Sequence, residues 1–238
     1  MASAANGRDG VKAKDRSRYL LDRRRALGLL ALGGAMAIAG RGQAASSDGT
    51  SRPLRYLAYV DGNRSGIQDI EFVPREHGFT VMTSLCIRLE LAFVTLYRLQ
   101  QTGQEDWKDG RLLAFEYITN DDGDTTHVTA QRDGSGNFVV NGQNGQKTYP
   151  GDAACASFWS NGILNRRQLI DPLTGELAGL SIRSLEQKSA RIAGKTIRGS
   201  GYAFQTFIDG TLWFDEHGRT LALAFEKNRH KIALVREA

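Results

Sequence analysis

Apolar and polar residues alternate along most of the chain after residue 53, and turn residues interrupt the alternation at short intervals. A period of two places the apolar side chains on one face of a strand. Strands separated by turns about 8–12 residues apart are typical of antiparallel sandwiches, barrels and curved sheets. The pattern predicts strands over residues 54–60, 66–73, 79–101, 111–120, 125–132, 137–141, 146–149, 167–170, 177–185, 189–192, 196–208, 211–214, 220–225 and 231–235.

The strand 111–120 lies in the middle of a predicted meander, between a polar turn at 105–110 and an acidic turn at 120–124. Only the segment 153–160 lacks the β pattern, and its small residues predict one short helix that ends at Asn161-Gly162. The alternation of strands and helices that marks parallel α/β folds is absent from the sequence. The predicted fold class is therefore mainly β, as an antiparallel curved sheet or a half-open barrel or sandwich with one short helix.

The long segment 79–101 is the most ambiguous part of the pattern. It alternates with period two and then changes phase near Leu91, so a long strand with a bulge or bend fits it. A helix over 85–99 is the alternative, since leucines and an alanine also recur there at helical spacing, at Leu85, Leu89, Ala92, Leu96 and Leu99.

The first 44 residues have the layout of an export signal. The basic residues Arg23, Arg24 and Arg25 precede an uncharged run of 15 residues, 26–40, and small residues up to Ala44 offer a cleavage site. The run is shorter than the roughly 20 residues that a transmembrane helix needs. The arginines followed by Leu27 favour recognition by the twin-arginine export machinery. The general secretory route and an uncleaved N-terminal anchor are the alternatives.

These features predict a periplasmic or secreted bacterial protein, with no permanent membrane span after cleavage near Ala44. Residues 45–53 are small and polar and are interpreted as a flexible leader, and residues 54–238 are predicted to form a single β-domain.

Removal of the signal changes the charge of the protein. The first 44 residues hold nine of the 31 basic and three of the 26 acidic side chains, which leaves 22 basic and 23 acidic side chains. The mature chain therefore lacks the positive surplus that nucleic-acid binding requires, and no nucleic-acid partner is expected. A solvated strand edge explains the adjacent pair Arg166 and Arg167 as well as a bound ligand does. The two cysteines, Cys86 and Cys155, could pair in an oxidising compartment, or Cys86 could be a small buried apolar residue.

The spacing of reactive side chains predicts no catalytic residue, no metal site and no cofactor. None of the four histidines lies within four residues of another, and no Gly-x-Ser-x-Gly elbow or phosphate-binding glycine loop is present. The acidic stretch 120–124 is interpreted as a hairpin turn rather than a calcium loop, since Thr129 stands where a calcium-binding Glu would be needed. Glu90 and Glu116 interrupt apolar strands and are expected to point outward.

Five short motifs follow one another along the chain: Trp107-x-x-Gly110-x-Leu112, Thr119-Asn120-Asp-x-Gly123, Ser157-x-Trp159-x-x-x-Ile163-Leu164, Thr174-Gly175 and Leu212-Trp213-Phe214-Asp215-x-x-Gly218. In this order they resemble a family of exported bacterial proteins known as domain of unknown function 6134. The resemblance covers about residues 54–235 and implies an export signal but no established activity or catalytic residue. More distantly, the succession of strands is similar to the half-barrel sheets of periplasmic lipoprotein carriers.

The aromatic residues indicate a possible binding function. A curved sheet lined by rings near its turns could hold a lipid or another apolar small molecule, or a partner protein, on its concave face. The competing interpretation is that the rings form the core. A periplasmic hydrolase that uses buried carboxylates or Cys155 is a second hypothesis, and an interaction protein that uses an exposed sheet edge is a third. The predicted ligand-binding residues are Tyr97, Trp107, Tyr117, Phe158, Trp159 and Trp213.

Overall fold

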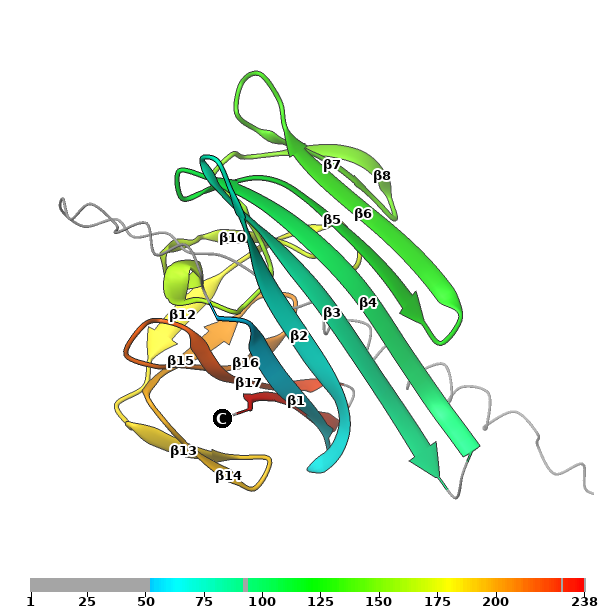
Figure 1. Cartoon of the computed structure of the whole chain (residues 1–238), viewed down its shortest axis with the longest axis vertical. Coiled ribbons are helices and arrows are strands. Elements are labelled where there is room, and N and C mark those ends of the chain that lie inside the picture. The colour runs from blue at the N-terminus through cyan, green and yellow to red at the C-terminus, as the bar shows by residue number, and fades with distance from the viewer. Residues whose placement is uncertain (1–51, 92–93, 228, 238) are drawn as a thin grey trace, which may run out of the picture.

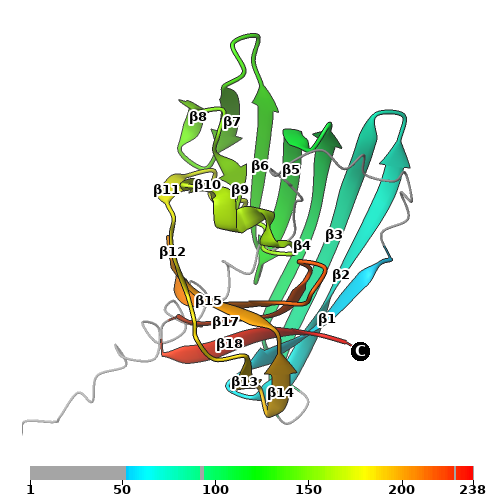
Figure 2. The ribbon, with the colours of Figure 1, turned by 90° about the vertical axis from the view of Figure 1, so that its left-hand side faces the viewer.

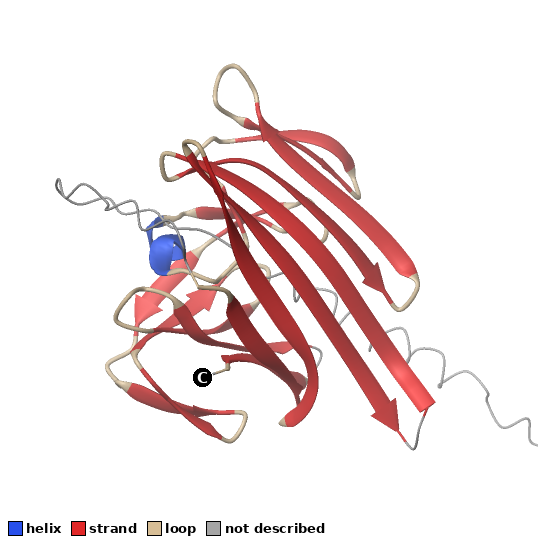
Figure 3. Ribbon diagram, viewed as in Figure 1, coloured by secondary structure: helices blue, strands red, loops and turns tan. Residues whose placement is uncertain are grey.

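The computed structural model describes residues 52–91, 94–227 and 229–237, and strands dominate it (Figures 1 and 3). The export signal predicted for residues 1–44 and most of the leader lie outside the described residues. Within the described part of the chain, no helix has the length and apolar character needed to cross a membrane.

The first half of the described chain is a meander of eight strands, and most of the described connections between them are tight turns. Three of the turns are Asp-Gly pairs in which both residues have positive φ, at Asp61, Asp109 and Asp122 and the glycine after each. This is the type I′ geometry that matches the twist of a two-residue hairpin. The strands are β1 (Leu54–Val60), β2 (Asn63–Arg75), β3 (Gly78–Leu91), β4 (Val94–Lys108), β5 (Arg111–Asp121), β6 (Asp124–Arg132), β7 (Phe138–Gly142) and β8 (Gly145–Tyr149).

The second half returns to the same sheet. It consists of β12 (Ser181–Ser184), β15 (Ser200–Gln205), β16 (Asp209–Phe214), β17 (Thr220–Lys227) and β18 (His230–Arg236), with a hairpin of β13 (Ser189–Ile192) and β14 (Lys195–Arg198). The large sheet has thirteen strands in the order β12-β15-β16-β17-β18-β1-β2-β3-β4-β5-β6-β7-β8. All neighbours are antiparallel, and pairing of β1 with β18 joins the two halves. The sheet curves without closing into a barrel (Figure 2). The predicted fold class is confirmed.

The ambiguous segment 79–101 forms two paired strands, β3 and β4. The β character is confirmed and the helix over 85–99 is wrong in the described residues. One long strand with a bulge is also wrong, because β3 ends at Leu91 and β4 begins at Val94 and pairs with β3 antiparallel. The change of phase near Leu91 falls where β3 ends and the antiparallel β4 begins, next to a register shift between Leu89 and Glu90. Buried and exposed residues alternate along β4, so that Tyr97, Leu99 and Trp107 face inward.

The remaining elements form an inner layer against the concave face of the sheet (Figure 2). They are β9 (Ala154–Cys155), the short 3₁₀ helix η1 (Asn161–Asn165), β10 (Gln168–Ile170) and β11 (Leu177–Gly179), and these strands form a separate three-stranded sheet. We call residues 153–170 the inner segment.

The helix predicted over 153–160 is wrong in position, because the only helical turn of the described residues follows it. All eight residues of 153–160 are buried, so the segment has no solvent-facing side for an amphipathic helix. Its backbone finds partners elsewhere: β9 pairs with β10, and the Ala156 N–H donates to the Ile170 carbonyl at 2.9 Å. Ser160 caps η1 by accepting a hydrogen bond from the backbone N–H of Gly162.

Two apolar clusters stabilise the sheet from opposite faces. The larger one fills the space between the concave face and the inner segment. The smaller one lies under the β13–β14 hairpin and contains Leu57, Trp213 and Val235. The sheet is therefore covered on both faces along β1, β16, β17 and β18.

Candidate functional site

The six aromatic residues predicted to bind a ligand are all buried, with exposed fractions between 1 and 3%. Five belong to the larger cluster, whereas Trp213 belongs to the smaller cluster on the other face of the sheet. The structure therefore brings Tyr97, Trp107, Tyr117, Phe158 and Trp159 to one side and separates Trp213 from them.

The inner segment occupies the concave face where an apolar ligand was expected. The Phe158 ring packs 5.1 Å from the Phe204 ring, and the Trp159 ring meets the Phe72 ring edge-on at 4.9 Å, between centroids. The cavity left beside Phe158 and Trp159 has a volume of about 10 Å³, which is too small for an acyl chain. Ligand binding by these rings stays a prediction, and it would require displacement of the inner segment.

The most unusual group on the concave face is the carboxyl of Glu105, which is completely buried. Its Oε1 accepts a hydrogen bond from the Tyr117 hydroxyl at 2.9 Å, and its Oε2 accepts one from the Trp107 indole N–H at 3.0 Å. The side chains of Ser157 and Cys155 also hydrogen-bond to it. Glu105 thus links β4 and β5 to the inner segment. The prediction of a turn at 105–110 is wrong for its first four residues, because β4 continues to Lys108.

Burial raises the pKa of Glu105 to about 7, and the hydrogen bonds from Ser157, Tyr117, Trp107 and Cys155 oppose that rise. Burial also raises the pKa of the Cys155 thiol well above its usual range, and the neighbouring Glu105 adds to the effect. A thiol with a raised pKa is a poor nucleophile, because the thiolate is the reactive form. This arrangement supports a structural role for Glu105 and Cys155.

Both cysteines are free thiols, and they lie on opposite faces of the sheet. Cys86 follows Leu85 and precedes Ile87, which both face inward, so Cys86 faces outward and is half-buried. We expect a thiol reagent to label only Cys86 in the folded protein and both cysteines in denaturant, as counted by intact mass. A two-hydrogen increase in mass on reduction would contradict this prediction, because it would reveal a disulfide.

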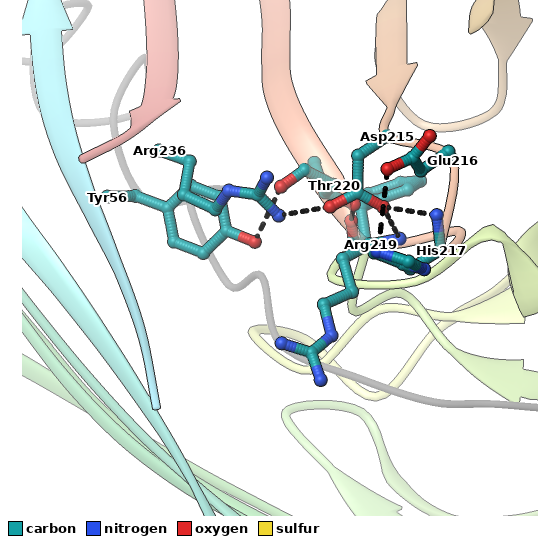
Figure 4. A network of polar contacts seen from close by, with 8 residues as sticks. Tyr56, Asp215, Glu216, His217, Arg219, Thr220 and Arg236 are labelled. Atoms are coloured by element: carbon teal, nitrogen blue, oxygen red, sulfur yellow. Dashed lines mark hydrogen bonds and ion pairs between the residues drawn. The ribbon is translucent and has the colours of Figure 1, made fainter. Parts of the chain in front are cut away.

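A second polar network lies at the turn between β16 and β17 (Figure 4). Asp215 Oδ1 accepts hydrogen bonds from the backbone N–H groups of His217 at 3.0 Å and Arg219 at 2.9 Å, and Oδ2 lies 2.8 Å from Arg236 Nη1. Burial alone would raise the pKa of Asp215, but the hydrogen bonds from Arg219 and Arg236 lower it. The side chains of Asp215 and Arg236 are only 17% and 22% exposed.

The same turn holds the inner segment in place. The Thr220 hydroxyl donates to the Phe158 carbonyl, and the Thr220 N–H donates to the Trp159 carbonyl at 2.9 Å. The Tyr56 hydroxyl on β1 donates to the Thr220 carbonyl at 3.0 Å. The motif that ends in Asp215-x-x-Gly218 therefore fixes the framework and presents no reactive group to a cleft.

A hollow lies at the end of the sheet where β1 meets β2 and where β4 begins. Its volume is about 600 Å³, within the range of small-molecule sites. We call it the end pocket. Its apolar lining residues are Val60, Ile67, Leu89, Leu96 and Tyr97, and its charged lining residues are Asp61, Arg64, Arg88, Glu90 and His230.

The charges at the rim of the end pocket are mostly paired with each other. His230 Nδ1 lies 2.6 Å from Asp61 Oδ2, and Arg88 Nη1 lies 3.4 Å from Glu90 Oε1. The pocket therefore offers apolar walls and a polar rim with little net charge. Tyr97 is the one predicted ligand-binding residue that lines it. The alternation of apolar and polar residues does not single out the other lining residues, although it changes phase in the apolar run around Leu89 and Leu96.

The structure also places the other acidic residues for which the sequence led to an expectation. Glu90 and Glu116 are exposed, as expected, and Glu116 Oε1 lies 2.6 Å from His127 Nε2. The stretch 120–124 forms a turn in which the Gly123 N–H donates to the Asn120 side chain, so the hairpin interpretation is confirmed. Within the described residues, no group of three or more His, Cys, Asp or Glu side chains could hold a metal ion.

A comparison with family models finds a match over residues 56–237, to a family described as domain of unknown function (DUF6134). The match covers the large sheet from Tyr56 onward and the whole of the inner segment. A search among curated proteins finds no match.

Among solved structures, the chain is similar to a crystal structure titled as a β-barrel-like protein of domain of unknown function DUF1849 from Brucella abortus. The TM-score is 0.51 and the sequence identity is 10%, over 78% of this chain and 95% of the other. At this identity the likeness shows the fold alone. It is consistent with the expected distant similarity to half-barrel sheets.

Proposed function

We propose that this chain, which belongs to the DUF6134 family, is an exported envelope protein that binds an apolar small molecule or lipid in the end pocket. The observation that supports this proposal most directly is the apolar hollow of about 600 Å³ between β1, β2, β3 and β4. The inner segment packs against the concave face and leaves a cavity of only about 10 Å³ beside Phe158 and Trp159, so the proposal places the ligand at the end of the sheet.

The chemistry of the end pocket favours a ligand with a long apolar part and a small polar end. Val60 and Tyr97 are buried and form fixed walls, whereas Leu96 is 41% exposed and lies where a ligand would cover it. Since Asp61 already pairs with His230 and Arg88 with Glu90, the rim offers hydrogen bonds without strong attraction for one sign of charge. A long-chain fatty acid or a related lipid fits this description.

Export through the twin-arginine machinery, by way of residues 1–44, belongs to the same proposal. Its support is the basic stretch that ends in Arg25, the apolar run after it and the small residues before the predicted cleavage site near Ala44. The mature protein would then meet lipids in the periplasm. The burial and raised pKa of Cys155 support a binding role over a hydrolytic one.

The test is titration of the purified protein with a fluorescent long-chain fatty acid. Leu96 and Leu113 are matched leucines, 41% and 37% exposed, of which only Leu96 lines the end pocket. Leu96→Glu places a charge against the ligand and is expected to weaken binding by about tenfold or more, which corresponds to about 1.4 kcal/mol or more. Leu113→Glu is expected to bind like the wild type.

Two outcomes would count against the proposal. One is an equal loss of affinity in both variants, which would indicate non-specific adsorption. The other is native mass spectrometry of protein from its own envelope fraction that shows a bare mass, combined with no binding of the fatty acid. Such a result would direct attention to the exposed edges of the sheet and to partner proteins.

A further inference from the structure

A second hollow lies at the opposite end of β4 from the end pocket. It has a volume of about 300 Å³ and lies between the start of β5, the end of β6 and the loop before β9. Three arginine side chains line it, together with one carboxylate and several small residues. The charged lining residues are Arg111, Arg132, Asp152 and Arg166. We call it the arginine pocket.

Arg132 is held in place by backbone carbonyl groups. Its Nε donates to the Leu112 carbonyl at 2.6 Å, its Nη2 donates to the Gly151 carbonyl at 2.8 Å, and its Nη1 donates to the Gly136 carbonyl. Its guanidinium also stacks over the Phe138 ring at 4.3 Å from the centroid. No carboxylate shares in these contacts, so the arginine is fixed while its positive charge remains uncompensated.

The close approach of Arg132 to the loop requires glycine at position 151. A Cβ at Gly151 would lie 2.2 Å from the Gly136 carbonyl oxygen and 2.9 Å from Arg132 Nη1. The backbone on both sides of the guanidinium therefore packs too tightly for any larger residue. This fit pre-organises the positive charge, which lowers the ordering cost of binding an anion.

The other two arginines add to the same positive field. Among the described residues, neither Arg111 nor Arg166 forms an ion pair. Burial lowers the pKa of Arg166, and the charge of Asp152 opposes this effect only in part. Burial lowers the pKa of Arg132, and the charges of Arg111 and Arg166 lower it further. Among the described residues that line the pocket, three positive side chains therefore stand against one negative side chain, Asp152.

We propose that the arginine pocket binds a phosphate group, either free or as the headgroup of a lipid. Guanidinium groups offer paired N–H donors that match phosphate oxygens, and Arg111 and Arg166 have theirs available. The small residues Gly151, Ala153 and Ala154 leave room for a compact anion rather than a large one. The site is separate from the end pocket, and neither proposal depends on the other.

The test compares Arg166→Gln with Arg167→Gln in the purified protein. Arg167 is the exposed neighbour and does not line the arginine pocket, so it is a matched control for net charge. Calorimetric titration with glycerol phosphate and with inorganic phosphate measures binding of the free group. Flotation with vesicles of phosphatidic acid in phosphatidylcholine, against phosphatidylcholine alone, measures binding of the headgroup.

We expect Arg166→Gln to weaken binding by about tenfold or more and Arg167→Gln to leave it within about twofold, with both variants showing wild-type thermal unfolding. Binding to soluble phosphates would identify a free ligand, and binding to phosphatidic acid vesicles alone would identify a lipid headgroup. The proposal is overturned if the wild type binds neither, or if both variants weaken binding equally, since that would be non-specific attraction to basic side chains.

Discussion

Replacement of Trp159 by alanine is expected to lower the free energy of unfolding by about 3–5 kcal/mol, the usual cost of removing a buried aromatic ring. Trp159 is 3% exposed and packs edge-on against Phe72 across the concave face. Its removal would leave a cavity between the inner segment and the sheet. The hydrogen bond from Thr220 to the Trp159 carbonyl would still fix the backbone there, so collapse into the space would be incomplete.

Two further variants make the measurement specific. Trp159→Phe keeps a ring and removes an indole N–H that has no hydrogen-bond partner among the described residues, so it is expected to cost less than about 1.5 kcal/mol. Leu113→Ala, at an exposed position, is expected to cost less than about 0.5 kcal/mol. Denaturant unfolding followed by circular dichroism measures all three. If Trp159→Ala were as mild as Leu113→Ala, the inner segment would not be part of the core.

The second large effect concerns the pH dependence of stability. Glu105 has an ordinary pKa of 4.5 in the unfolded chain and a pKa of about 7 in the folded protein. Between these two values the unfolded chain has lost the proton while the folded protein retains it. The free energy of unfolding therefore falls as pH rises from 4.5 to about 7, and this group contributes a loss of about 3 kcal/mol. Below 4.5 and above 7 its contribution is constant.

Glu105→Gln is the variant that isolates this contribution. An amide does not titrate, so the variant is expected to lose the fall in stability between pH 4.5 and 7, whatever its absolute stability. Glu116→Gln, at an exposed glutamate on the neighbouring strand, is expected to keep the wild-type profile. The carboxyl of Asp215 has a lowered pKa and acts in the opposite direction, below pH 4. Parallel pH profiles for wild type and Glu105→Gln would refute the assignment.

The sequence predicted the sheet well because its signals are local. Strand alternation and Asp-Gly turns depend on neighbouring residues, so they specify β1, β5 and β6 without knowledge of the fold. The buried position of Glu105 was not predicted, because a charged residue within the polar stretch 105–110 is typical of a turn. Its true signal is the alternation of Tyr97, Leu99, Gln101, Gly103, Glu105 and Trp107, in which polar residues take inward positions. The Gln101 Nε2 donates there to the Thr119 hydroxyl, a partner 18 residues away, whereas its Oε1 has no hydrogen-bond partner among the described residues.

The inner segment and the two pockets could not be predicted, because each depends on distant parts of the chain. The backbone of 153–160 pairs with β10 and with the β16–β17 turn, and neither partner can be read from the segment itself. The face of Trp213 depends on the β13–β14 hairpin, which gives the outer side of the sheet its own core. Arg166 was seen only as one of a basic pair, and its proximity to Arg111 and Arg132 arises from the fold.

The pairing of β1 with β18 has a consequence for how the chain folds. Within the meander β1–β8, each pair of neighbouring strands is also consecutive in sequence, so these hairpins can form from local contacts. The β1–β18 seam instead brings together residues as distant as Tyr56 and Arg236. Closing so large a loop is slow, because its entropy is lost before the contacts are gained. The β1–β18 pairing is therefore expected to form later than the hairpins on either side of it.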